Sequence, residues 1–387
     1  MSYLDLGVIS TFPPRKDGIA AFTHDLLGAV TCSHPNINAC VAAITDAESY
    51  YPYPQYVRWE IEQGNSNSYS IVGRALSQAR LSLVLLQHEF GLYGVWDNLA
   101  DPLQDHTAAL LDTINAPLIT TLHTVLPQPR ADVRDVIRRL SQQSAAIIVM
   151  ADAGVKILTD DYDIEPARIV TIPFGVPAVR RLNIDYAKRI LQLQEHTTIC
   201  TFGLLGRNKG IETVIQALPK IVSCHPDLLY LVVGETHPQV YKREGESYRH
   251  ELVTLARALG VSRHVRFVNR YLDQQHLIRF LQATDVYVTP YHDHDQITSG
   301  TLSYALACGR AIVSTPYVYA MEVLAEDRGL LADVHSATSI GDCISMYLDD
   351  PSFRHNYEER AWSYGHAMAW THVGDRYAQL FQQIASG

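Results

Sequence analysis

The residues from Asp285 to Pro316 combine small and polar side chains in a pattern that suits phosphate binding. This segment, DVYVTPYHDHDQITSGTLSYALACGRAIVSTP, is typical of a buried strand, a polar loop, a helix and a second buried strand. Ser299-Gly300-Thr301 falls where that helix should begin, with Leu302 next. A helix N-terminus presents backbone N–H groups and the positive end of the helix dipole. The spacing therefore predicts a cradle of backbone amides for a phosphate or diphosphate.

Two cations precede another predicted helix. Arg207 and Lys209 lie in GLLGRNKGIE, between an apolar strand and the helical pattern of Ile211–Ile221. Both residue types donate hydrogen bonds and carry positive charge, which suits them to phosphate recognition at a helix start. The alternative interpretation is that both are solvated cations of an ordinary loop.

The run His292-Asp293-His294-Asp295 raises the question of a metal site. Alternate residues of an extended segment point the same way, so two of the four could act as ligands together. A complete site needs three or four converging ligands, and the sequence offers no obvious partner for the run. We therefore predict no metal site and no cofactor.

These residues need strands and helices to position them, and short apolar runs alternate with helical patterns along the whole chain. Apolar runs separated by helices indicate parallel sheets covered on both faces, an α/β class. The helical patterns are Ile19–Ala29, Asp132–Gln142, Ile211–Ile221 and Trp370–Ile384. The candidate strands are Leu4–Ser10, Leu81–Gln87, Leu118–Leu122, Ala145–Met150, Ile169–Ile172, Thr198–Gly203, Leu228–Val233, Val265–Val268, Asp285–Thr289 and Ala311–Ser314.

A charged stretch without strand character, within Pro177–His196, marks a domain boundary. We expect doubly wound, Rossmann-like domains at residues 1–180 and 181–368, with residues 369–387 as a final helix that closes the second domain or crosses back onto the first. In open α/β sheets, ligands bind beyond the carboxyl ends of the strands. Two such domains facing each other would place their sites in one central cleft.

The composition limits the classes of function. A chain of 387 residues with 47% apolar and 19% charged residues is typical of a two-domain globular protein. A formal net charge of -10 argues against general nucleic-acid binding. Six scattered cysteines without a CxxC pair, and no recognisable signal peptide or membrane span, predict a cytoplasmic protein. Peripheral membrane contact stays open.

The ordered set of motifs resembles the retaining glycosyltransferases of family 4, also called group 1, which have the GT-B fold. The matching pieces cover almost the full length and include TFPPRKDGIAAFTHDL, LQHEFGLYG, TTLHTV, TIPFGVP, GLLGRNKGIETVIQAL, LVVGE, ATDVYVTPY, SGTLSYALACGRAIVSTP and AWTHVGDRY. The resemblance implies transfer of a sugar from a nucleotide-sugar substrate to an acceptor hydroxyl, without an essential metal. The acceptor would bind mainly to the first domain and the donor to the second.

The resemblance also implies roles for particular residues. Lys209-Gly210 matches a lysine–glycine step at the donor diphosphate, although Leu204 stands where an arginine is usual and Arg207 would supply that charge. His123, after LITTL, would orient a sugar hydroxyl or share charge near the reacting sugar. The remaining implied positions are Gly18, Gly234, Glu235, Arg270 and Tyr271 on the donor side and Arg15, His88 and Glu89 on the acceptor side. For His123, the loop at Gly18, and the pair His88 and Glu89, a structural role is the competing interpretation.

The segment after Asp285 departs from the common pattern of two glutamates seven residues apart. Aligned on Cys308-Gly309, those positions hold Gln296 and Tyr304. A tyrosine hydroxyl binds a ribose diol less strongly than a carboxylate, because it is neutral. Gln296 still offers hydrogen bonds to hydroxyls, and Asp295 could supply a negative charge. A branch with an SGTL-x-YAL segment in place of the glutamate pair is the better match.

Three functions follow as hypotheses. The first is a retaining, metal-independent hexosyltransferase, with mannose from GDP-mannose preferred over glucose from a UDP-sugar. The second is a nucleotide-sugar epimerase, which would need an acid/base pair. The third is a non-catalytic nucleotide-sugar binder, which the missing glutamates bring into question. The acceptor, a saccharide or other hydroxyl compound, is not specified by the sequence.

Overall fold

The computed structural model describes residues 3–47, 49–96 and 101–386, which form two compact units. The first unit comprises Met1–Gly175, Gln296–Thr298 and Trp370–Gly387, and the second comprises Val176–Asp295 and Ser299–Ala369. The divisions fall near residues 175 and 369, where the sequence suggested 180 and 368. The last helix of the chain therefore belongs to the first unit.

The first unit is built on a seven-stranded parallel sheet with the order β3-β2-β1-β4-β7-β8-β9. A short antiparallel pair, β5 and β6, lies outside it. Every residue of β4 is buried, as expected for a strand covered on both faces. The strands are β1 (Leu4–Ser10), β2 (Ile37–Thr45), β3 (Val57–Glu62), β4 (Leu83–His88), β5 (Gly94–Val95), β6 (Gln104–Asp105), β7 (Leu118–Leu122), β8 (Ala146–Val149) and β9 (Ile169–Thr171).

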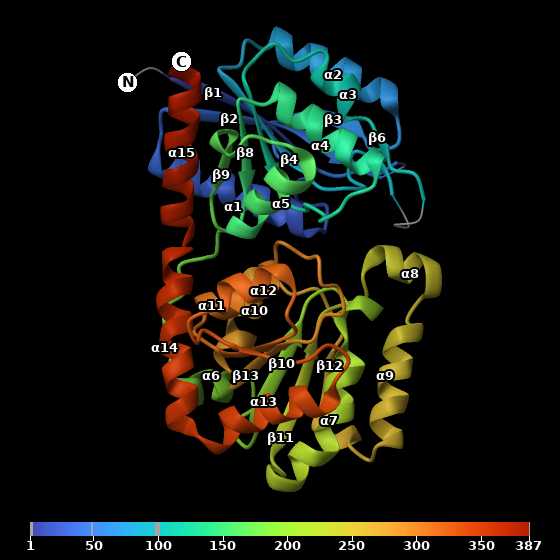
Figure 1. Cartoon of the computed structure of the whole chain (residues 1–387), viewed down its shortest axis with the longest axis vertical. Coiled ribbons are helices and arrows are strands. Elements are labelled where there is room, and N and C mark those ends of the chain that lie inside the picture. Colours follow the sequence, from blue (N-terminus) through green and yellow to red (C-terminus); the bar gives the residue numbers. More distant parts are fainter. Residues whose placement is uncertain (1–2, 48, 97–100, 387) are drawn as a thin grey trace. The chain divides into compact units, whose positions relative to one another are not determined.

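The helices of the first unit lie along both faces of its sheet (Figure 1). Helix α1 begins where the Asp17 carboxylate accepts a hydrogen bond of 2.7 Å from the Ala20 N–H. Its buried face packs against α15, the final helix, which adds Val373, Tyr377 and Phe381 to the core. The helices are α1 (Gly18–Ser33), α2 (Ser66–Gln78), α3 (Thr107–Leu111), α4 (Ala131–Gln143), α5 (Asp152–Tyr162), η1 (Pro166–Arg168) and α15 (Trp370–Ser386).

The second unit is built on a six-stranded parallel sheet with the order β12-β11-β10-β13-β14-β15. The internal strand β11 reads LLYLVV and is buried throughout. A continuous apolar run of this kind fits a strand covered by helices on both faces. The strands are β10 (Thr197–Phe202), β11 (Leu228–Val233), β12 (Val265–Val268), β13 (Val286–Thr289), β14 (Ala311–Ser314) and β15 (Leu330–Leu331).

Helices also flank the second sheet (Figure 1). Gly365 of α14 lies so close to α11 that a side chain there would meet the backbone of Leu306 and Ala307. This close packing fixes α11 within the unit. The helices are α6 (Ile184–Ile190), η2 (Arg207–Lys209), α7 (Ile211–Cys224), α8 (Pro238–Glu244), α9 (Ser247–Ala258), η3 (Ser262–His264), α10 (Gln274–Gln282), α11 (Gly300–Ala307), α12 (Val318–Val323), α13 (Ala337–Asp349) and α14 (Pro351–Ala367).

Each predicted strand is present, with ends that differ by at most two residues, and the α/β class with two doubly wound domains is confirmed. The predicted set lacks β2, β3, β15 and the short antiparallel pair β5 and β6. Strand β2 carries a buried apolar run, so its sequence did hold a signal. Strand β3 lies at a sheet edge and alternates exposed and buried residues, which gives a weaker pattern.

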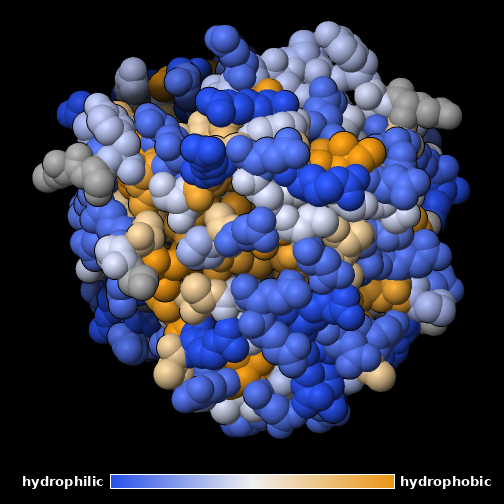
Figure 2. Space-filling view, turned by 90° about the horizontal axis from the view of Figure 1, so that it is seen from above, coloured by the Kyte–Doolittle hydropathy of each residue, from blue (hydrophilic) through white to orange (hydrophobic). Residues whose placement is uncertain are grey.

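On the face seen in Figure 2, hydrophilic residues cover most of the surface, and hydrophobic residues form small patches between them. Such scattered patches are ordinary for a globular surface and do not by themselves mark a site. Within the described ranges, no helix is long and apolar enough to cross a membrane.

Candidate functional site

The order of the second sheet points to one place for a ligand. Strand β10 lies between β11 and β13, and the strand order runs outward in opposite directions on either side of it. Ligands of doubly wound sheets bind beyond the carboxyl ends of the strands at such a switch point. The loops that follow β10, β11 and β13 are therefore the first candidates.

Glycines bring these loops into close contact. Gly203 and Gly234 follow β10 and β11 with φ of +132° and +135°, a region that favours glycine. A side chain at Gly234 would overlap the carbonyl oxygen of Gly203. A Cβ at Gly203 would lie 3.3 Å from Cγ2 of Thr301, at the start of α11. The ends of β10 and β11 and the start of α11 thus form one compact surface.

Helix α11 begins with the predicted Ser299-Gly300-Thr301 step. The Ser299 hydroxyl caps the helix by accepting a long hydrogen bond of 3.4 Å from the Leu302 N–H. The Leu302 side chain is fully buried, so only its backbone faces the helix start. The first N–H groups of an α-helix lack acceptors within the helix, so Gly300 and Thr301 can present theirs to an anion.

Lys209 lies beside this helix start. Its Nζ is 3.8 Å from the centre of the Tyr291 ring, and the Tyr291 hydroxyl is 2.8 Å from that of Thr301. Burial lowers the pKa of Lys209 to about 8, and the nearby Asp293 carboxylate opposes that shift. The ammonium is therefore still mostly protonated at pH 7, in a poorly hydrated place where it attracts anions strongly.

The loop that carries Lys209 is held in place by Gly210. This residue has φ of +62°, and a side chain there would overlap the carbonyl oxygen of Pro290 and lie 2.7 Å from Nε2 of His292. The His292 N–H also donates to the Asn208 carbonyl at 2.9 Å. These contacts press the loop after β10 onto the loop after β13, which sets Lys209 over Tyr291.

Arg207 points elsewhere. Its guanidinium makes ion pairs of 2.9 Å with Glu244 of α8 and 2.7 Å with Glu251 of α9, and half of its side chain is exposed. The side chain also lies over the ring of Tyr248, 5.4 Å from its centre. The Arg207 guanidinium, which the sequence suggested as a second diphosphate ligand, is thus engaged by two carboxylates. Lys209 instead contacts Tyr291, whose hydroxyl contacts Thr301 of α11.

The two residues that replace the usual glutamates have local partners. The Tyr304 hydroxyl accepts a hydrogen bond of 3.0 Å from the Gln274 side chain at the start of α10. Gln296 donates to the Thr298 carbonyl at 2.7 Å, and these residues are grouped with the first unit. Asp295 is largely exposed. Its pKa is raised, mainly because part of the carboxyl is desolvated and secondly because the Asp293 charge is near, while His294 opposes this shift.

The predicted base-side residues lie at the ends of β11 and β12. The Glu235 carbonyl accepts a hydrogen bond of 2.9 Å from the Leu205 N–H, which ties this loop to the loop after β10. Arg270 is exposed, and Tyr271 keeps 43% of its surface exposed. Gly234 is linked to the α11 start through Gly203, and contact of these residues with a ligand stays a prediction.

In the first unit, His123 lies just past the carboxyl end of β7. Its Nε2 is 2.8 Å from Oε1 of Gln87, and its ring packs edge-on against Phe22. Burial, followed by the charge of His88, lowers the pKa of His123 to about 3. The imidazole is therefore neutral at pH 7 and can donate to or accept from a hydroxyl, but it cannot supply positive charge.

His88 and Glu89 belong to a buried hydrogen-bond network. His88 is fully buried and contacts Asp105 at 3.3 Å. Burial of the Asp105 carboxyl opposes ionisation, but its bonds with His88 and Thr107 prevail and lower its pKa. Glu89 accepts hydrogen bonds from Thr124 at 2.8 Å and from the Phe90 N–H at 2.9 Å, while burial raises its pKa. Both residues organise the strand ends, and acceptor contact stays a prediction.

Arg15 is held by the protein itself. Its side chain is 11% exposed and forms ion pairs of 3.1 Å with Asp17 and 3.2 Å with Asp46. It also donates to the Ile44 carbonyl at 3.0 Å, so it joins the loop before α1 to the end of β2. Gly18, at the start of α1, has open space where a side chain would be. A ligand could approach the backbone there, whereas Arg15 has little freedom to turn.

Sequence reasoning gave no role to Tyr291 or Arg249 and could not tell what Gly210 contacts. Tyr291 follows β13 within a motif that was noted, yet its ring under Lys209 could not be foreseen. Gly210 matched a motif, but its tight contact with Pro290 depends on the neighbouring loop. Arg249 of α9 is buried at the ends of β11 and β12. A single arginine in a helix carries no sequence signal for such a place.

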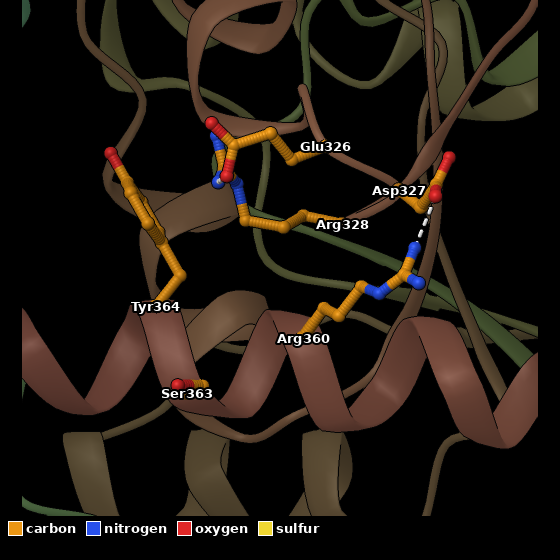
Figure 3. Close-up of a pocket in the computed structure, with 6 residues that line it drawn as sticks. All are labelled: Glu326, Asp327, Arg328, Arg360, Ser363 and Tyr364. Atoms are coloured by element: carbon orange, nitrogen blue, oxygen red, sulfur yellow. Dashed lines mark hydrogen bonds and ion pairs between the residues drawn. The ribbon is translucent and has the colours of Figure 1, made fainter.

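Other charged clusters in the second unit do not form a comparable site. A hollow of about 470 Å³ between the α12–β15 loop and α14 is lined by Glu326, Asp327, Arg328, Arg360, Ser363 and Tyr364 (Figure 3). Its two arginines already pair with its two carboxylates. Among the described residues, no three His, Cys, Asp or Glu side chains are grouped to hold a metal ion, and the run from His292 to Asp295 is included in that statement.

Comparison with known proteins shows which family the second unit of this chain resembles. Residues 184–363 match the family described as glycosyl transferases group 1. The chain is 26% identical over 302 residues to a D-inositol 3-phosphate glycosyltransferase of Corynebacterium aurimucosum, covering 72% of this chain and 68% of that protein. It is 21% identical over 402 residues to a GDP-mannose-dependent monoacylated alpha-(1-6)-phosphatidylinositol monomannoside mannosyltransferase of Corynebacterium glutamicum, covering 97% of each.

A solved structure supports the fold at full length. The chain is similar to HepE of Anabaena, crystallised in complex with UDP, with a TM-score of 0.75 and 14% sequence identity. The similarity covers 98% of this chain and 100% of that one. At this level of identity, the likeness concerns the fold alone.

Proposed function

We propose that this chain, which matches the group 1 glycosyltransferases over residues 184–363 and has the GT-B fold, moves a hexose from a nucleotide-sugar donor to an acceptor hydroxyl. The second unit binds the donor, and the first unit supplies the acceptor side. The preferred donor is GDP-mannose, and the transfer retains the anomeric configuration.

One observation carries this proposal. Lys209, with a pKa of about 8, lies over the Tyr291 ring, whose hydroxyl contacts Thr301 at the start of α11. The Lys209 ammonium and the N-terminus of α11 thus lie close to one place, at the strand ends where the strand order of the sheet reverses. That combination suits a diphosphate, because both elements stabilise negative charge without rearranging.

The chemistry follows from the charge that develops. When the bond between the anomeric carbon and the diphosphate oxygen breaks, negative charge grows on the diphosphate. Lys209 and the amides at Gly300 and Thr301 stabilise that charge. The departing diphosphate oxygen takes the proton of the acceptor hydroxyl, which attacks from the same face. This route needs no protein nucleophile, and neutral His123 would orient a hydroxyl.

The donor preference draws on the relatives. One relative is named as GDP-mannose-dependent, whereas the structural neighbour HepE binds UDP, so a UDP-sugar such as UDP-glucose is the alternative donor. An epimerase would need an acid/base pair placed against the sugar, and the donor incubation described next tests for epimerisation directly. A non-catalytic binder stays in competition because Gln296 and Tyr304 replace two glutamates.

The test is incubation with radiolabelled GDP-mannose and UDP-glucose, first alone and then with an acceptor panel. The panel includes inositol phosphate and phosphatidylinositol monomannoside, which the names of the relatives suggest. Slow donor hydrolysis and labelled product support transfer, and NMR of the product reports its anomeric configuration. Conversion of the donor to its epimer would overturn the proposal, and binding without any turnover would favour the non-catalytic alternative.

The protonation state of Lys209 predicts a pH dependence. The kcat/KM for the nucleotide sugar should be nearly constant below pH 8 and fall by up to tenfold per pH unit above it, because deprotonation removes the positive charge. The measurement is kcat/KM for the nucleotide sugar between pH 6.5 and 10. Lys209→Arg should remove the alkaline fall, since arginine stays protonated in this range. An identical fall in that variant would assign it to another group.

Tyr304 offers a test of its assignment to the ribose position. Tyr304→Glu should tighten nucleoside diphosphate binding by roughly 5–10-fold, because a carboxylate accepts hydrogen bonds from a diol more strongly than a neutral hydroxyl. Calorimetric titration measures this, with pyrophosphate as a ligand that lacks ribose and should bind equally to both proteins. Equal gains for both ligands, or no gain, would contradict the assignment.

Chelation tests the proposal that no metal is needed. Overnight dialysis against EDTA should leave the turnover of the donor unchanged, because Lys209 and the α11 N-terminus supply the charge that a metal ion would otherwise provide. The assay compares dialysed protein with and without added Mg²⁺ or Mn²⁺. A loss of activity that returns with one of these ions would contradict this prediction.

A further inference from the structure

Arg249 occupies an unusual place for a charged residue. It lies on α9, is 7% exposed, and has its guanidinium at the carboxyl ends of β11 and β12. Its Nη2 donates to the Gly234 carbonyl at 3.0 Å and to Oδ1 of Asn269 at 2.7 Å, and its Nε donates to Glu246 at 2.9 Å. Arg249 therefore ties together the two loops that follow these strands.

The neighbours of Arg249 form a closed polar network. The Thr236 hydroxyl donates to Glu246 at 2.7 Å. Burial opposes ionisation of Glu246, but bonds from Thr236, Arg249 and Asn269 lower its pKa. The Arg249 Nη1 is buried and has no acceptor among the described residues. A buried donor without an acceptor is destabilising, so this arginine is a costly way to join two loops.

The network fixes the orientation of an exposed amide. A guanidinium only donates hydrogen bonds, so the oxygen of the Asn269 amide must face Arg249. The amide nitrogen is then turned toward the Glu246 carboxylate, which accepts one of its two N–H groups. Because Asn269 is exposed, the second N–H group is accessible to a ligand at the strand ends, where it would bind a carbonyl oxygen and repel another N–H donor.

The Arg249 network lies at a distance from the α11 start that suits the base of a nucleotide whose diphosphate binds at α11. Gly234 touches Gly203, which in turn borders Thr301 at the start of α11. Neighbouring strands lie about 4.8 Å apart, so β12 is about 10 Å from β10, roughly the reach of a ribose and base beyond the phosphates. Gln274, which contacts Tyr304, begins the helix just after β12.

We propose that Arg249 is a positioning residue for the nucleobase, and that with Asn269 it selects bases with a carbonyl oxygen on that edge, uracil or guanine, over adenine. The inference rests on the proposed function, because it takes the diphosphate to lie at Lys209 and α11. Arg249 acts through Asn269 and Gly234. The selectivity is thus set by a residue that does not itself touch the ligand.

The experiment separates the base from the diphosphate. Calorimetric titrations of the full chain compare UDP, GDP, ADP and pyrophosphate with wild type, Arg249→Lys, Asn269→Ala and the double variant. Asn269 is exposed, so its truncation should leave the fold intact. Arg257→Lys is the matched control, because Arg257 lies on the same helix but is exposed.

Wild type should bind the better of UDP and GDP about tenfold or more tightly than ADP. Arg249→Lys and Asn269→Ala should each lower the affinity for that nucleotide by about 5–30-fold, so that it approaches the affinity for ADP. The affinity for pyrophosphate should stay unchanged in both variants. The double variant should lose little more than either single variant, because the two residues act as one unit. Arg257→Lys should match wild type throughout.

Two results would overturn the inference alone. One is an unchanged preference over ADP in both single variants. The other is an equal loss of pyrophosphate and nucleotide affinity in Arg249→Lys, which would indicate a general structural role. A wild-type protein that binds neither pyrophosphate nor any nucleoside diphosphate would overturn the proposed function, and the inference with it.

Discussion

Replacing Lys209 by alanine is expected to lower kcat/KM for the nucleotide sugar by about 10²–10³-fold, equivalent to about 2.7–4 kcal/mol of transition-state stabilisation. The reason is its place over Tyr291 beside the α11 N-terminus, where burial makes its charge effective. Most of the loss should appear in kcat, because charge on the diphosphate grows as the bond breaks. Steady-state kinetics with saturating acceptor, or donor hydrolysis without acceptor, gives the measurement.

The matched control is Lys220→Ala. Lys220 lies on α7, is largely exposed, and pairs with Asp342 at 2.7 Å. Removing an exposed ion pair of this kind should change stability by at most about 1 kcal/mol and leave turnover unchanged. Lys209→Arg should retain part of the activity, because it keeps the charge but changes its shape. Unaltered kinetics in Lys209→Ala would remove this residue from the donor site.

Replacing Gly210 by alanine should destabilise the second unit by about 2–5 kcal/mol. About 1–2 kcal/mol comes from the left-handed φ of +62°, and the rest from overlap with the Pro290 carbonyl oxygen. Relief of that overlap must move the Lys209 loop away from Tyr291, so donor turnover should fall even where the protein remains folded. Denaturant unfolding and donor hydrolysis measure the two effects separately.

The control for Gly210→Ala is Gly245→Ala. Gly245 has nearly the same φ, +60°, but nothing lies within 4 Å of where its Cβ would be. The control should therefore show only the backbone cost, about 1–2 kcal/mol, and normal turnover. Equal destabilisation of the two variants would mean that the loop after β10 yields freely, and that Gly210 does not hold Lys209 in place.

The sequence predicted much of the fold because its main signals are local. Apolar runs and their helical spacing gave every strand from Leu118–Leu122 to Ala311–Ser314 within two residues. The helix start at Ser299-Gly300 follows from a small polar cap before a glycine, which needs no tertiary contact. Strand β3 was not predicted, because an edge strand alternates buried and exposed residues over a short length.

The sequence could nominate residues of the site but could not give their partners. Arg207 and Lys209 are two residues apart, and both were expected to bind the diphosphate, Lys209 on the better motif match. The fold turns Arg207 toward Glu244 and Glu251 and sets Lys209 over Tyr291. Glu244 and Tyr291 come from distant parts of the chain, so no local pattern could distinguish the two cations.

By itself, the sequence determined the α/β class, the position of most strands and the helix start at Ser299-Gly300-Thr301, because strand periodicity and helix caps depend on neighbouring residues. Only the tertiary structure decided which charged side chains lie near that helix start. The lowered pKa of Lys209, the neutral state of His123 and the place of Arg249 all depend on burial. Burial is a property of the packed chain, since it is created by residues far away in sequence.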